Sequence, residues 1–426
     1  MNETGGMKET GGMKETNGKP RLPSLTGQPW LLDPVLQELL RALGGDHQAR
    51  VIGGAVRNAL MGEPVSDVDI ATVHPPQEAM KRAREAGFSV HPVGLEHGSV
   101  VVSKRGRAFE VTTLRRDVET DGRHAVVDWT DDWRADAARR DFTVNALYAD
   151  SRGRIHDPLG GHADLVARRL RFIGDAGKRI EEDYLRILRY FRFWARYGEG
   201  DPDEEALAAI SARRAGLERI SRERIRAELA RLLVAPRALE ALLHMADAGV
   251  LDHTLPPSCE RDFTTLARMA ADDRRHGLEP DWILRLAALC GPATGGLPRA
   301  LRLSRAEAAL LAFLRDATPP EERRDWRPFV FEHGNEAALA AVRLWHARGL
   351  LGDDEFTAAM QVARHWRPPR FPLTGKDVIA AGIAPGPRVG QILRATRERW
   401  LANGFKPRSR EKLLEMMKSL ARDEGS

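Results

Sequence analysis

Two aspartates separated by one residue, Asp67 and Asp69, are the side chains in this sequence best suited to chemistry. Alternate side chains of an extended segment point to the same face, so the two carboxylates should lie a few ångströms apart. Carboxylates held this close repel each other unless a cation lies between them. Hard oxygen ligands suit Mg²⁺, which keeps several waters and completes its shell with substrate phosphates. The pair therefore predicts a magnesium site.

A glycine turn just before the aspartates would place a phosphate beside that metal. An apolar run over 49–52 predicts a strand that ends at Gly53 and Gly54, which lack the Cβ that would keep a phosphate from the backbone. A helix should follow, with unpaired N–H groups at its start and Arg57 in its first turn. Either feature alone is more often a tight turn or a helix cap. Together, between residues 51 and 71, they predict a site for a metal ion and a triphosphate.

Glu110 is a third carboxylate that could belong to this site. Three runs rich in strand-forming residues follow the aspartates, over 88–94, 98–104 and 108–114. In the last run Glu110 alternates with Phe109 and Val111, so its side chain should point away from the core. Glu110 either completes the site as a catalytic carboxylate or is an exposed strand residue, and the sequence leaves both alternatives open.

Charged residues recur at every third position in a second stretch, 181–198, which is predicted to be one helix. They are Asp183, Arg186, Arg189 and Arg192. Each step turns the stripe by about 60° on a helix, so the four cannot address a single point. Asp183 and Arg186 can face the same point, with Arg189 beside them. The alternative is that these arginines are solvated or ion-paired on the helix surface.

Composition limits the class of protein. A length of 426 residues is too long for a single core, and a net charge of +5 permits a polyanionic partner without requiring one. The two cysteines, Cys259 and Cys290, provide neither a disulfide framework nor a cysteine zinc site. Without a signal core or a membrane-length apolar run, the chain is expected to be cytoplasmic, with no membrane association and no obligate protein partner.

The order of elements predicts an α+β fold. A first helix should begin with Asp33 as its cap and Pro34 in its first turn, and prolines should open a helix over 74–87. The strands then form a small mixed sheet flanked by helices. The charged segment 115–136 is expected to be a mobile loop, and beyond residue 200 the apolar spacing is almost wholly helical.

The motifs also carry a family resemblance. It rests on GGAVRN, SDVDIAT, FEVTTLRRDVETDGRHA, RRDFTVNALY and EEDYLRILRYFRF, in this order. Together they resemble the bacterial and eukaryotic class, class II, of the tRNA nucleotidyltransferase and poly(A) polymerase family, from about residue 48 to 200. One position departs from the family pattern, which usually has Asp after the arginine of the glycine motif. Asn58 stands there, and it keeps hydrogen-bonding capacity without the charge.

The resemblance implies roles for individual residues and segments. Asp67 and Asp69 would bind Mg²⁺. The nucleotide would be contacted by Gly53, Gly54, Arg57, Arg140, Asp183, Arg186, Arg189 and Arg192. The implied domains are a disordered extension (1–28), a catalytic head (29–173), a neck that reads the base (174–235), a helical body (236–320) and a helical tRNA-binding tail (321–426).

An aspartate–arginine pair suits the selection of cytosine and adenine. An ionised aspartate only accepts hydrogen bonds and an arginine only donates them. Cytosine and adenine both present an amino donor beside an acceptor ring nitrogen. Uracil and guanine would place a carbonyl against the carboxylate, at a cost of about 1–3 kcal/mol. The resemblance implies that Asp183 and Arg186 read the base without a nucleic-acid template, and this selectivity agrees with that role.

The leading hypothesis is addition of CCA to the 3′ end of tRNA from CTP and ATP. The RNA 3′-hydroxyl would attack the α-phosphate with pyrophosphate as leaving group, and Mg²⁺ would assist. A poly(A) polymerase, or a relative that adds only C or only A, shares these motifs. A catalytically silent RNA-binding protein is the hypothesis from another class. The implied partner is tRNA, at its 3′ end and acceptor stem, and basic clusters over 219–231 and 388–410 are candidate contacts to its backbone.

Overall fold

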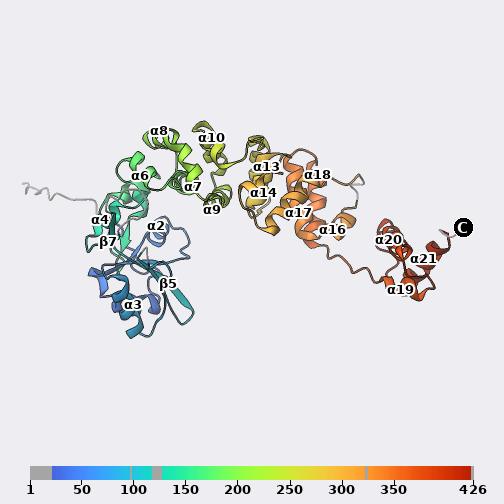
Figure 1. Ribbon diagram of the computed structural model, residues 1–426, viewed down its shortest axis with the longest axis horizontal. Coiled ribbons are helices and arrows are strands. Elements are labelled where there is room, and N and C mark those ends of the chain that lie inside the picture. Colours follow the sequence, from blue (N-terminus) through green and yellow to red (C-terminus); the bar gives the residue numbers. More distant parts are fainter. Residues whose placement is uncertain (1–21, 96–97, 118–126, 322–324, 424–426) are drawn as a thin grey trace, which may run out of the picture. The chain divides into compact units, whose positions relative to one another are not determined.

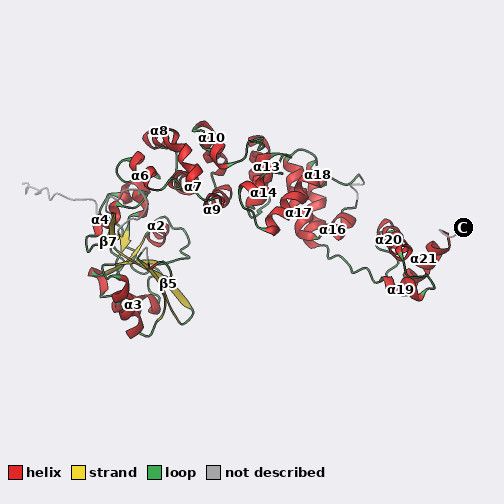
Figure 2. Cartoon of the chain, viewed as in Figure 1, coloured by secondary structure: helices red, strands yellow, loops and turns green. Residues whose placement is uncertain are grey.

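The computed structural model describes residues 22–95, 98–117, 127–321 and 325–423. They fold as two compact units. The first runs to Ile220 and includes His244–Val250, and the second contains Ser221–Leu243 and the chain from Leu251 onward. Strands occur in the first unit, whereas the regular elements described in the second are helices (Figure 2). The predicted α+β class, with a mixed sheet followed by helices, is confirmed.

A seven-stranded sheet lies at the centre of the first unit, in the order β3-β4-β5-β2-β1-β8-β9. Its strands are β1 (Ala49–Ile52), β2 (Asp69–Thr72), β3 (Ser89–His91), β4 (Ser99–Lys104), β5 (Arg107–Thr113), β8 (Tyr148–Ala149) and β9 (Ile155–His156). The β2–β5 pair is parallel and the other neighbours are antiparallel. Parallel pairing requires a crossover, which α3 (Pro76–Glu85) and the β3–β4 hairpin supply. Helix α3 packs against these strands, as its position near β5 in Figure 1 illustrates.

Helix starts in this unit follow the sequence signals. Helix α1 (Pro34–Ala42) begins with Asp33 as its cap, and the Asp33 carboxylate accepts from the N–H groups of Val35 (2.8 Å) and Leu36 (3.3 Å). Pro75 and Pro76 open α3. Both predicted starts are confirmed, because a cap acceptor and a proline at the first helical position depend only on local sequence.

Two local predictions need correction. The disordered extension was predicted to reach residue 28, but Leu25 is buried and its N–H donates to the Gly153 carbonyl at 2.8 Å. The rest of that extension, 1–21, lies outside the described residues. The segment 115–136 is not simply a loop, since β6 (Arg115–Asp117) pairs with β7 (Val127–Trp129) and α4 (Trp133–Ala138) follows. Residues 118–126 between these strands are outside the described part.

The remaining elements of the first unit are short helices. They are η1 (Gly45–His47), α2 (Gly54–Leu60), η3 (Thr143–Asn145), α5 (Gly161–Val166), α6 (Ala176–Glu182), α7 (Arg186–Tyr197), α8 (Glu204–Arg213) and η4 (Arg214–Arg219). The predicted single helix over 181–198 is wrong. Asp183 has an extended backbone, with φ −153° and ψ 104°, and it separates α6 from α7.

Helices make up the rest of the chain. They are α9 (Arg222–Leu233), α10 (Ala238–Asp247), α11 (Leu251–Thr254), α12 (Phe263–Arg275), α13 (Trp282–Cys290), α14 (Leu297–Ala300), α15 (Arg305–Asp316), α16 (Arg327–His333), α17 (Asn335–Ala347), α18 (Asp353–His365), α19 (Gly375–Ala380), α20 (Pro387–Ala402) and α21 (Arg410–Asp423). Among the residues described, none of the helices combines the length and apolarity needed to cross a membrane.

The second unit contains a disulfide and a buried charge cluster. Cys259 and Cys290 are joined, a pairing that the sequence argument against a disulfide framework did not foresee. Asp273 is 3% exposed and accepts from two arginines, Arg285 at 3.0 Å and Arg343 at 2.7 Å. These contacts connect α12, α13 and α17. A buried carboxylate flanked by two guanidinium groups is stable only while all three remain.

Replacing Asp273 should therefore destabilise the second unit. In Asp273→Ala the buried Arg285 would lose its anionic partner, and the free energy of unfolding should fall by about 3–5 kcal/mol. Urea denaturation followed by circular dichroism measures the change. Asp354→Ala, at an exposed position in the first turn of α18, is the control and should shift stability by about 0.5 kcal/mol or less. Equal stability of the two variants would contradict the assigned role of Asp273.

Candidate nucleotide and metal site

The register of the sheet brings the glycine turn next to the aspartates. Ile52, the last residue of β1, pairs with Asp69, the first residue of β2. On its other side Asp69 pairs with Glu110 of β5 in the parallel ladder. Gly53 follows Ile52 directly. Adjacent strands lie about 4.8 Å apart, so the turn and both carboxylates share one edge of the sheet.

Exposure across this edge alternates as predicted. Asp67 and Asp69 are exposed while Val68 between them is 8% exposed. Glu110 is exposed and lies between buried Phe109 and Val111. Asp67 precedes the strand rather than belonging to it, because β2 begins at Asp69. The three acidic residues are therefore exposed beside the start of β2.

Asp69 has a raised pKa. Burial of its carboxyl, together with the negative charges of Glu110 and Asp67, raises its pKa to about 6. Arg140 acts in the opposite direction. A pKa raised in this way means that the site lacks positive charge, which a divalent cation would supply.

The donor set suits a partly hydrated ion. Within the described ranges, no three or more His, Cys, Asp or Glu side chains are gathered closely enough to hold a metal ion. A pair of carboxylates with an open surrounding fits Mg²⁺, which keeps waters and takes further oxygens from a substrate. Glu110 acts on Asp69 electrostatically but is not part of a preformed three-ligand cluster.

The glycine turn leaves room for a ligand. Gly53 has φ +69°, a left-handed conformation that favours glycine, and it caps α2. A Cβ added to Gly54 would meet only the Arg57 guanidinium, at 3.8 Å, which is ordinary contact distance. The packing of the protein therefore does not itself demand glycine at position 54. Space for a substrate group is a consistent reason.

Arg57 is held by groups of the protein itself. It is 6% exposed, and its guanidinium donates to Asn145, to Asn58 (3.0 Å) and to the Tyr197 hydroxyl (2.9 Å). Burial lowers the pKa of Arg57, with Tyr197 opposing. Three protein acceptors therefore already hold the side chain, and the nucleotide contact expected of Arg57 stays a prediction.

Arg140 lies beside the acidic edge and is held by Asp136. Asp136 is fully buried and accepts from Arg139 (2.6 Å), Arg140 (3.0 Å) and the Tyr148 hydroxyl (2.9 Å). Burial acts to raise the pKa of Asp136, but the two arginines outweigh it and the pKa lies below its usual range. Arg140 also acts electrostatically on Asp69, and the nucleotide contact expected of it stays a prediction.

The residues of the second stretch are distributed over two elements. The Asp183 carboxylate accepts from the Leu185 N–H at 3.1 Å, just ahead of α7. Arg186, the first residue of α7, pairs with Glu182 and donates to the Arg179 (2.9 Å) and Arg139 (3.3 Å) carbonyls. Asp183 and Arg186 are thus close in the chain, but a neighbouring carboxylate occupies Arg186.

Arg189 and Arg192 lie farther along α7 around an aromatic ring. The guanidinium groups of Arg189, Arg192 and Arg57 lie 5.4, 4.1 and 5.0 Å from the centre of the Phe193 ring. Arg189 also donates to buried Asp141 through Nε at 2.8 Å. Burial works to raise the pKa of Asp141, yet Arg189 and Asn145 hold it below its usual value.

Sequence reasoning missed several residues that hold this site in place. Asp141 is one of them, and its carboxylate accepts from Arg189, Asn145 and the Phe142 N–H. Asn145 and Tyr197 received no role. A signal existed, because Asp141 and Asn145 both lie in the motif RRDFTVNALY and Tyr197 follows the arginine stretch.

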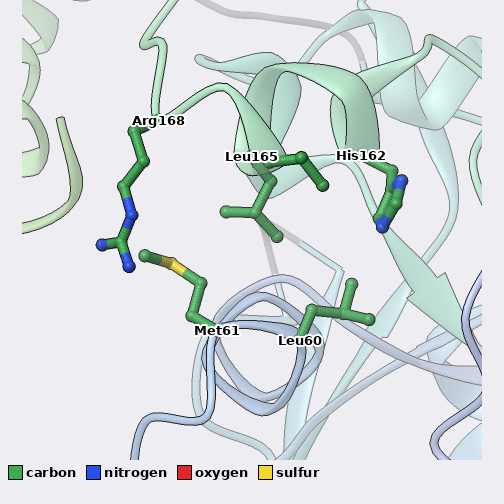
Figure 3. Close-up of a pocket in the computed structure, with 6 residues that line it drawn as sticks. Leu60, Met61, His162, Leu165 and Arg168 are labelled. Atoms are coloured by element: carbon green, nitrogen blue, oxygen red, sulfur yellow. The ribbon is translucent and has the colours of Figure 1, made fainter. Parts of the chain in front are cut away.

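A cavity of about 180 Å³ lies at the end of α2, away from these residues. Figure 3 shows Leu165 of α5 facing Leu60 and Met61, with Arg168 and His162 at its sides. None of the predicted nucleotide-binding residues lines it. The cavity is therefore not taken as the nucleotide site.

Comparison with known proteins identifies the family. Residues 49–171 match the Poly A polymerase head domain, and residues 201–260 match the probable RNA and SrmB-binding site of polymerase A. The mitochondrial CCA tRNA nucleotidyltransferase 1 of Mus musculus is 34% identical over 388 residues, which cover 88% of this chain and 87% of that protein. The chain belongs to the tRNA nucleotidyltransferase and poly(A) polymerase family.

Bacterial members of the family are similarly related. The CCA-adding enzyme of Geobacillus kaustophilus is 35% identical over 363 residues, covering 82% of this chain and 87% of that protein. The crystal structure of the Bacillus stearothermophilus CCA-adding enzyme in complex with CTP superposes with a TM-score of 0.75 at 30% identity, covering 92% of this chain and 99% of that one. The resemblance found in the motifs thus extends well beyond residue 200.

The raised pKa of Asp69 gives a prediction for stability. Between the ordinary value of 3.8 and about 6, the folded protein holds a proton that the unfolded chain has released, so the contribution of Asp69 to stability is lost as pH rises through this window. Without divalent metal, Asp69→Asn should raise Tm relative to the native protein more at about pH 8 than at about pH 5. Differential scanning calorimetry measures both. A difference independent of pH would contradict the assignment, and Asp201→Asn, at an exposed position, is the control for the loss of one carboxyl group.

Proposed function

We propose that this protein adds CCA to the 3′ end of tRNA from CTP and ATP, without a template. The observation that carries the proposal is the sheet register that places Asp69 between Glu110 and the residue before the glycine turn. Family membership supports it, since relatives at 34–35% identity are a CCA tRNA nucleotidyltransferase and a CCA-adding enzyme. A poly(A) polymerase, or a relative adding C or A alone, is the alternative within the family.

The acidic edge is the proposed centre of the reaction. Asp67 and Asp69 would hold Mg²⁺, with Glu110 as a third carboxylate beside them. When bound, the ion would promote ionisation of the attacking hydroxyl and stabilise charge on the phosphates. Gly53 and Gly54 admit the triphosphate, and Arg140 places a positive charge near Asp69. Such positioning and electrostatics supply most of the acceleration in phosphoryl chemistry.

Asp183 and Arg186 are the proposed readers of the base. The carboxylate would accept from the amino group of cytosine or adenine, and the guanidinium would donate to the ring nitrogen. Arg186 must exchange Glu182 for the base. The proposed tRNA contacts lie in the helical part of the chain. The predicted domain boundaries stay predictions, and so does the cytoplasmic location. The relatives include mitochondrial as well as bacterial proteins.

The function is tested with tRNA lacking its last three nucleotides. Incubation with labelled CTP should extend it by two residues, and CTP with ATP by three, whereas repeated addition of A would identify a poly(A) polymerase. Asp67→Ala and Asp69→Ala should abolish incorporation and retain tRNA binding. Asp201→Ala, at an exposed position, is the matched control and should remain active. Unchanged incorporation by both active-site variants would refute the proposal.

Base selection is tested separately at Asp183. Asp183→Ala should lower the preference for CTP over UTP by about tenfold, because the acceptor that penalises a carbonyl is gone. The measured quantity is the ratio of kcat/KM for the two nucleotides. Glu205→Ala, on exposed α8 surface, should leave the ratio unchanged. An unaltered ratio in Asp183→Ala would remove Asp183 from the base site.

A further inference from the structure

A closed ring of hydrogen bonds joins α2 to the end of α7. Arg57 Nη2 donates to Asn58 Oδ1 at 3.0 Å and to the Tyr197 hydroxyl at 2.9 Å. The same hydroxyl donates to Asn58 Oδ1 at 3.0 Å. Arg57 and Tyr197 are 6% and 7% exposed. Each of the three groups therefore fixes the other two in a site with little access to water.

Asn58 connects this ring to the segment that leads to Asp67. Its Nδ2 donates to the Pro64 carbonyl at 3.1 Å, and its backbone carbonyl accepts from the Glu63 N–H at 2.8 Å. These donor and acceptor assignments orient Oδ1 toward Arg57 and Tyr197. Only Val65 and Ser66 separate Pro64 from Asp67. The position of Asp67 thus depends on a turn that Asn58 holds.

A second residue near the end of α7, Arg196, also contacts this turn. Arg196 donates through Nε to the Tyr197 hydroxyl at 3.0 Å and through Nη2 to Glu63 at 3.0 Å. Through its other terminal nitrogen, Nη1, Arg57 donates to Asn145, whose amide donates to Asp141 at 2.9 Å. Asp141 in turn holds Arg189 of α7. The helix that carries the arginines and the turn that precedes Asp67 are therefore parts of one polar network.

We propose that Tyr197 is a positioning residue for nucleotidyl transfer. Its hydroxyl holds Arg57 and Asn58 in place, and through Asn58 it fixes the approach of the chain to Asp67. The inference rests on the proposed function. It also gives buried Arg57 a role, which is to hold the turn rather than to contact a phosphate.

The hydroxyl, rather than the aromatic ring, is the critical group. The Tyr197 ring lies 4.3 Å from the Arg57 guanidinium and 5.9 Å from the Phe193 ring, contacts that phenylalanine would keep. Arg57 Nε is already buried with no hydrogen-bond partner among the described residues. Loss of the hydroxyl would remove one further acceptor from a buried cation, which is costly where water cannot replace it.

The experiment compares Tyr197→Phe with Tyr190→Phe. Tyr190 is buried on the same helix, and its hydroxyl accepts from the Asp203 N–H at 3.0 Å, so this control loses one buried hydroxyl away from α2. The measurements are kcat for CTP addition to the truncated tRNA, the concentration of MgCl₂ giving half-maximal rate, and Tm. Tyr197→Phe should lower kcat about tenfold and raise that MgCl₂ concentration, since the bond involves a charged partner. Tyr190→Phe should leave both near the native values.

A second variant keeps the inference testable if Tyr197→Phe folds poorly. Asn58→Ala breaks the same ring at a half-buried position and should shift the MgCl₂ dependence in the same direction. The double variant, with Tyr197→Phe and Asn58→Ala, should lower kcat no more than the more damaging single variant does. Both substitutions remove the same interaction. A native MgCl₂ dependence in both variants would overturn the role of Tyr197. A native protein that adds no nucleotide would instead overturn the proposed function itself.

Discussion

The site depends on the register at the start of β2. Asp69 pairs with Ile52 on one side and Glu110 on the other, so one position in the sheet brings together the glycine turn and two of the carboxylates. Because side chains alternate along a strand, a slip of one residue would turn Asp69 into the core and Val68 outward. The buried Val68, Ile70 and Val111 make that slip unfavourable. Ordinary hydrophobic packing therefore fixes where the acids lie.

Around this edge the protein holds charge in fixed positions. Asp136 secures Arg139 and Arg140, and Asp141 secures Arg189, with the carboxylates buried in both cases. Buried ion pairs of this kind contribute little net stability, because desolvation offsets their attraction. What they provide is orientation that need not be created when a substrate binds. The directions of these arginines are thus set by the fold itself.

The parts of the site that could be predicted from sequence are those set by local rules. Alternation placed Glu110 on the exposed face, paired glycines marked the turn, and Asp33 marked a helix start. The burial of Arg57 could not be predicted, because it depends on Tyr197, which lies 140 residues along the chain. The break at Asp183 was missed because charged residues at helical spacing continue through it. The family resemblance supplied the order of motifs but not these contacts.

The pairing of Arg186 with Glu182 has a consequence for recognition. A guanidinium that already holds a carboxylate must give up that partner when a base binds, so the exchange adds little affinity. A base that presents the wrong pattern would break the existing pair and offer nothing equivalent in return. For the proposed base reader this arrangement sacrifices tight binding for discrimination, since specificity is a difference between affinities rather than their size.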